Sequence, residues 1–191
     1  MKKSLSMTSV AVLLVAVTLI GAGCQKKTQT PATSQGAISN EQGPADPWKE
    51  YQNAKPVTDG LAPVTFGRPD GTLTISVPKT WKAFGATWQP TDAKIDHIRV
   101  AHFSSDGPMT AWDAQKKLDV HVVVDAEQKD GRYFLMVNHP SLQASILKVF
   151  IPDPASPGIG YYFFECRAGY KSDRTSLWNA CKAAYNSLTI K

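Results

Sequence analysis

The sequence has few of the features that usually indicate a particular chemistry. Its three cysteines include no Cys-x-x-Cys pair, and its four histidines include no His-x-x-x-His or His-Glu-x-x-His spacing. It has no Gly-x-Ser-x-Gly turn, no glycine-rich phosphate loop and no long run of Lys or Arg. These absences exclude the common redox, zinc-protease, hydrolase and nucleotide motifs and argue against a nucleic-acid partner. We expect no cofactor and no metal, although a metal site built from distant residues stays open.

Long hydrophobic runs are also scarce. The longest spans residues 10–20, whereas a helix that crosses a bilayer needs about 20 apolar residues. Lys2 and Lys3 precede the run and small residues follow it, which is the pattern of a secretory signal peptide. We therefore expect the chain to be exported, and the alternative is that the run stays as an uncleaved N-terminal anchor.

The signal ends in Ile20-Gly21-Ala22-Gly23-Cys24, which resembles the lipobox of bacterial lipoproteins. Gly21 occupies the position that usually holds Leu. The resemblance implies that residues 1–23 are a lipoprotein signal peptide and that Cys24 becomes an acylated N-terminus. Two or three acyl chains would give stable membrane anchoring. The Gln that follows Cys24 implies, by resemblance to Gram-negative lipoproteins, the outer membrane facing the periplasm.

The segment after the lipid site has the composition of a tether. Residues 24–45 are rich in Gln, Thr, Ser, Pro, Gly and Ala, contain no aromatic residue and include one large aliphatic, Ile38. Such a segment buries too little apolar surface to fold, so we expect it to be disordered. Residues 46–191 have the length of a single domain.

Two cysteines remain if Cys24 carries lipid. An exported chain most simply pairs Cys166 with Cys181 in a structural disulfide. A metal or redox pair is the alternative, but redox motifs of this kind usually place the cysteines two residues apart.

Patterning in residues 46–191 predicts an α+β fold. Asp46 and Pro47 begin a short helix, and Arg68-Pro69-Asp70-Gly71 predicts the turn of a β-hairpin. Several strands follow, and a final helix capped by Ser172 or Asp173 should run to about residue 187. Residues 142–151 carry apolar side chains on both faces, which favours a sheet covered on both sides. We predict a mostly antiparallel sheet of six or seven strands with the C-terminal helix packed on one face.

Two short features resemble the PsbP-like superfamily. Pro78 and Trp81 form a Pro-x-x-Trp step after the hairpin, and the last helix leads into a Ser-Leu signature at Ser187 and Leu188. The resemblance covers about residues 62–190. It implies an accessory, partner-binding domain, and it carries over no functional residue.

Candidate site residues come from loops and from the histidines. Trp88 lies between Gly85 and Pro90 in an irregular stretch, and Trp81 lies beside one. An exposed ring there could bind a partner or stack on a sugar. The alternative for both rings is packing in the core. His97 and His102 are five apart on a predicted strand and should face opposite sides. We expect a non-enzymatic, lipid-anchored envelope protein that binds another envelope protein or component. The alternatives are an envelope hydrolase using His97, His102 and Asp96, or a carbohydrate- or peptidoglycan-binding module.

Overall fold

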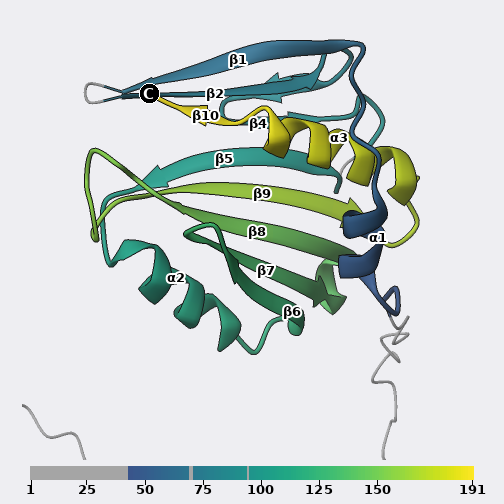
Figure 1. Cartoon of the computed structure of the whole chain (residues 1–191). Helices are drawn as coiled ribbons and strands as arrows, with labels where there is room; N and C mark the ends of the chain where they lie inside the picture. The colour runs from purple at the N-terminus through teal and green to yellow at the C-terminus, as the bar shows by residue number, and fades with distance from the viewer. Residues whose placement is uncertain (1–42, 69–70, 94) are drawn as a thin grey trace, which may run out of the picture. The chain divides into compact units, whose positions relative to one another are not determined.

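Figure 1 shows the computed structural model of the chain, which describes residues 43–68, 71–93 and 95–191. The signal peptide, the lipid site at Cys24 and most of the tether lie outside these ranges, as do the central residues of the first hairpin turn. No helix within the described ranges is long and apolar enough to cross a membrane.

The described chain contains three α-helices, one short 3-10 helix and ten strands. They are α1 (Pro47–Asn53), β1 (Leu61–Arg68), β2 (Gly71–Pro78), β3 (Lys82–Phe84), β4 (Thr87–Gln89), β5 (His97–Phe103), α2 (Gly107–Lys116), β6 (Val122–Lys129), β7 (Arg132–His139), η1 (Pro140–Leu142), β8 (Ala144–Pro152), β9 (Tyr161–Gly169), α3 (Arg174–Asn186) and β10 (Thr189–Ile190).

A seven-stranded antiparallel sheet forms the centre of the domain. Its strand order is β3-β4-β5-β9-β8-β7-β6, and every neighbouring pair is antiparallel. This confirms the predicted α+β class and the strand number. The first hairpin, β1 and β2, does not join this sheet as the sequence suggested. It pairs instead with β10 in a separate three-stranded sheet, because the chain end returns alongside β2.

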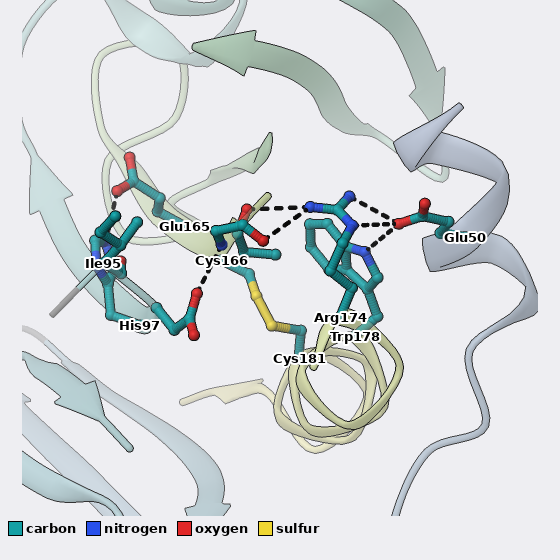
Figure 2. The surroundings of a disulfide bond; sticks show 11 residues. Glu50, Ile95, His97, Glu165, Cys166, Arg174, Trp178 and Cys181 are labelled. Carbon is teal, nitrogen blue, oxygen red and sulfur yellow. Dashed lines mark hydrogen bonds and ion pairs between the residues drawn. A yellow bond between two sulfur atoms is a disulfide. The ribbon is translucent and has the colours of Figure 1, made fainter. Parts of the chain in front are cut away.

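The larger hydrophobic core lies between the two sheets, on the side of the seven-stranded sheet that we call the α3 face (Figure 1). Helix α3 begins where Asp173 accepts a hydrogen bond from the Ser176 amide at 3.2 Å, as predicted. Its Trp178 is only 1% exposed. The Cys166–Cys181 disulfide joins α3 to β9 across a Cα–Cα distance of 6.0 Å (Figure 2). The predicted disulfide is therefore present in the structure.

Helix α1 is held against α3 by one shared carboxylate. Asp46 accepts from the Lys49 amide at 2.8 Å and so begins α1, as predicted. Glu50 then accepts hydrogen bonds from Arg174 Nε at 2.9 Å and from Trp178 Nε1 at 3.0 Å (Figure 2). These contacts connect the start of the domain to its last helix.

The opposite side of the sheet, which we call the α2 face, carries a smaller core covered by α2 (Figure 1). Trp112 of α2 packs against this core, and its Nε1 donates to the Phe134 carbonyl at 2.9 Å. The predicted cover on both sides is thus confirmed. Helix α2 begins at Gly107, and Pro108 fits within its first turn.

Candidate functional site

A row of charged residues crosses the α2 face beside α2. Glu165 of β9 lies directly opposite Arg99 of β5 in the strand ladder. On its other side Glu165 lies opposite Lys148 of β8. Directly opposed residues of neighbouring strands project from the same face of a sheet. The register therefore places Arg99, Glu165 and Lys148 side by side across three strands. We call these three residues the charged row.

Glu165 is the buried centre of the row. It is 6% exposed, and its Oε1 lies 2.8 Å from His97 Nε2 and 3.1 Å from Arg167 Nη2. Burial acts to raise the pKa of Glu165, but the His97 hydrogen bond and the Arg167 charge outweigh burial and lower it overall. The carboxylate is therefore ionised at neutral pH and is engaged by His97 and Arg167.

Lys148 is half-buried and bonded to a neutral group. Its Nζ donates to Gln115 Oε1 of α2 at 2.5 Å. Burial lowers the pKa of Lys148, while the charge of Glu165 partly opposes that shift. The amide of Gln115 orients the ammonium group without neutralising its charge.

Two histidines, His121 and His139, lie at the margin of the charged row, and their pKa values respond to its charges. His121 Nε2 donates to the Gln115 carbonyl at 2.9 Å, and the His139 ring centre lies 6.5 Å from that of His121. Burial lowers the pKa of both. The charge of Lys148 lowers the pKa of His121 further, and the charges of Arg167 and Lys148 lower that of His139 against an opposing effect of Glu165. The electrostatic environment of this part of the α2 face is therefore positive.

The charged row forms one end of a groove of about 390 Å³ beside α2. We call this cavity the α2 groove. The other end is aromatic, with Phe103 5.2 Å from Tyr161 and Phe150 5.2 Å from Phe163 between ring centres. Its complete lining is Arg99, Phe103, Asp106, Ala111, Ala114, Gln115, Lys148, Phe150, Tyr161, Phe163 and Glu165. A cavity with apolar walls and a few convergent polar groups has the composition of a small-ligand site.

A larger cleft of about 530 Å³ lies between α1 and α3. Its polar groups include Glu50, whose carboxylate accepts hydrogen bonds from both Arg174 and Trp178. Since these groups already dock α1 on α3, we assign the candidate site to the smaller α2 groove.

The two tryptophans predicted as binding residues lie away from the α2 groove. Trp88 is only 3% exposed, within β4, and its ring packs edge-on against Phe66 at 5.5 Å. The hypothesis of a Trp88 exposed on a loop is therefore wrong, and the alternative of core packing is confirmed, because the three-stranded sheet covers the ring. Trp81 is half-buried at the edge of the α3-face core.

The predicted histidines occupy opposite faces, as their spacing indicated. His97 lies on the α2 face with Glu165, whereas His102 bonds Asp153 Oδ2 at 2.7 Å and packs on Tyr162. Asp96 accepts a hydrogen bond from the Gly169 amide at 2.6 Å. The three residues of the hydrolase hypothesis therefore have separate partners and form no common acid–base site. Among the described residues, no three His, Cys, Asp or Glu side chains gather as metal ligands.

Sequence reasoning did not single out the charged row. Its signal was present, because Lys148 interrupts the apolar run of β8 and Glu165 follows four aromatic residues in β9. Charges inside strands of that kind are rarely buried without a partner. That rule would have marked them, but only the register shows that they meet.

A scan against protein-family models matched none, and a search of curated proteins found none similar to the chain. The fold and the groove together describe an α+β domain whose central sheet is covered on both faces and has a cavity on the α2 face.

Proposed function

We propose that the protein is a non-enzymatic binding or accessory protein of the cell envelope, lipid-anchored through Cys24, and that the α2 groove is its binding site. The observation that carries the binding role is the charged row at one end of an aromatic-lined cavity. Buried ionised groups cost stability unless they are paired. Lys148 is half-buried and donates its hydrogen bond to a neutral amide. A ligand bound in the groove would give this ammonium group the charged partner that the amide does not supply.

The sequence outside the described residues supports the anchored location. The lipobox-like segment before Cys24 favours acylation, and Gln25 favours the outer membrane facing the periplasm. An antiparallel sheet covered on both faces is compatible with the PsbP-like resemblance, which implies an accessory role.

Membrane fractionation tests the anchor. The full chain expressed in a Gram-negative host should appear in the outer-membrane fraction, and its mature mass should include the added acyl chains. The Cys24→Ala variant should lose that mass and leave this fraction. A wild-type chain that is soluble and carries no lipid would contradict the anchor but would not bear on the groove.

Site-specific crosslinking in cells tests the groove. A photoreactive benzoylphenylalanine at Ala114, an exposed residue of the groove lining, should form an adduct that is visible in the intact mass. The matched control places the same residue at Ala83, which is exposed in β3. Equal adducts at both positions, or none at Ala114, would overturn the groove as the binding site.

A further inference from the structure

We propose that the ligand of the α2 groove is an amphipathic organic anion, with its negative group between Arg99 and Lys148 and its apolar body against the aromatic end of the groove. This inference rests on the proposed binding function and names the ligand class.

The charges around the groove favour an anion. Glu165, the carboxylate of the charged row, is already engaged by His97 and Arg167. Lys148 bonds a neutral amide. Arg99 is exposed and, in the part of the chain that the structure describes, has no carboxylate within ion-pair distance. Within the described residues, therefore, two cations flank the groove and neither forms a contact ion pair with a carboxylate.

The register places those cations within reach of one ligand group. Arg99 and Lys148 are the two ladder neighbours of Glu165, one on each side. Both side chains are long and project from the same face, so their tips can converge above the shorter Glu165. A carboxylate, sulfonate or phosphate placed there would accept charge-assisted hydrogen bonds from both cations.

The aromatic end of the groove selects an apolar body. Phe103 is 40% exposed although it stacks on Tyr161, so its ring offers uncovered apolar surface. Asp106 lines the same cavity, and its charge contributes to the raised pKa of Tyr161, after the larger effect of burial. A second negative group at this end would meet the Asp106 carboxylate. The groove therefore favours a ligand with one anionic end and one apolar end.

Two fluorescent probes with the same ring system test this class. The first is 8-anilinonaphthalene-1-sulfonate, an aromatic anion, and the second is N-phenyl-1-naphthylamine, which lacks the sulfonate. The titrations use the mature chain with Cys24→Ala, which cannot be acylated, so no micelle is needed to keep it in solution. We expect the sulfonate to bind about tenfold more tightly or better, as a hydrogen-bonded charge interaction supplies.

Groove variants locate the binding. Arg99→Gln with Lys148→Met should weaken the sulfonate by at least about tenfold and leave the neutral probe unchanged. Lys79→Met removes an exposed lysine outside the groove and should change neither affinity. Circular dichroism confirms that each variant is folded.

The outcomes separate the ligand class from the proposed function. If both probes bind equally and Phe103→Ala weakens both, the groove binds ligands but the anion assignment is wrong. If neither probe binds, or if no groove variant affects either affinity, the groove is not a small-ligand site, and both the inference and the proposed groove function fail.

Discussion

The two faces of the seven-stranded sheet differ in how they are covered. On the α3 face, the second sheet, α3 and the disulfide enclose a core in which Trp178 is almost entirely buried. On the α2 face a single ten-residue helix covers part of the surface and leaves the charged row and Phe103 at a groove. One face is enclosed by apolar packing and a crosslink, whereas the other has a row of charged groups at a groove.

This difference shows where the fold can tolerate a binding site. Dense apolar packing contributes most to stability, and it leaves little room for a ligand. Charged groups beside a cavity contribute little to stability, since their desolvation offsets their attraction. Because packing on the α3 face supplies most of the stability, the domain can accommodate polar groups on its α2 face whose desolvation is energetically unfavourable.

The largest effect should come from the helix tryptophans, one on each face. Trp178→Ala removes a fully buried ring and should lower the free energy of unfolding by about 3–5 kcal/mol. Trp112→Ala removes a half-buried ring and one hydrogen bond, which should cost about 1–2 kcal/mol. Urea unfolding of both variants checks the comparison. Equal losses would contradict the view that the α3 face supplies most of the stability.

The disulfide comes next. It closes a loop with a sequence separation of 15 residues, and a loop of that size stabilises by about 3 kcal/mol in the chain-entropy model. Cys166→Ala with Cys181→Ala should lower the free energy of unfolding by that amount, and reductant should have no further effect on the variant. Affinity at the α2 groove should not change. A probe affinity that falls together with stability would show that the faces are coupled.

The fold class was predictable because its signals are local. Alternation in the strands, the apolar stripe of α3 and the Asp46 and Asp173 caps all lie within short stretches of sequence. The second sheet was not predictable, since β10 has only two residues and pairs with a strand more than a hundred positions earlier. Trp88 was misplaced for a related reason: Gly85 and Pro90 suggested a loop, and its cover comes from Phe66 of another sheet.

The site depends even more strongly on register. Arg99, Lys148 and Glu165 come from three different strands, and the local sequence of one strand does not indicate the other two residues. A shift of one residue in any pairing would move a side chain to the α3 face. Composition and spacing along the chain contain no information about that pairing, so the charged row could be recognised only after folding.

Replacement of the half-buried lysine separates binding from stability. Lys148→Met keeps the length of the side chain and removes a partly desolvated charge. We expect the free energy of unfolding to change by less than about 1 kcal/mol, because lost attraction to Glu165 is offset by relief of desolvation. Urea unfolding at neutral pH measures this change. A loss of several kcal/mol would mean that Lys148 serves the fold, and its position in the groove would then need no ligand to explain it.

The smallest expected effect is a pH dependence confined to the α2 face. The pKa values of His121 and His139 are lowered in the folded protein, so between pH 7.5 and 5 the unfolded chain binds more protons. The free energy of unfolding should therefore fall as the pH drops below the ordinary histidine pKa of about 6.5. The lowered pKa of Glu165 acts in the same direction below its unfolded value, at more acidic pH.

His121→Gln with His139→Gln should flatten the upper part of this dependence of the free energy of unfolding on pH. The variant that lacks both disulfide cysteines should keep the slope at a lower absolute stability. If the disulfide variant flattens the slope and the histidine variant does not, the titrating groups belong to the α3 face, and the electrostatic distinction between the two faces is wrong.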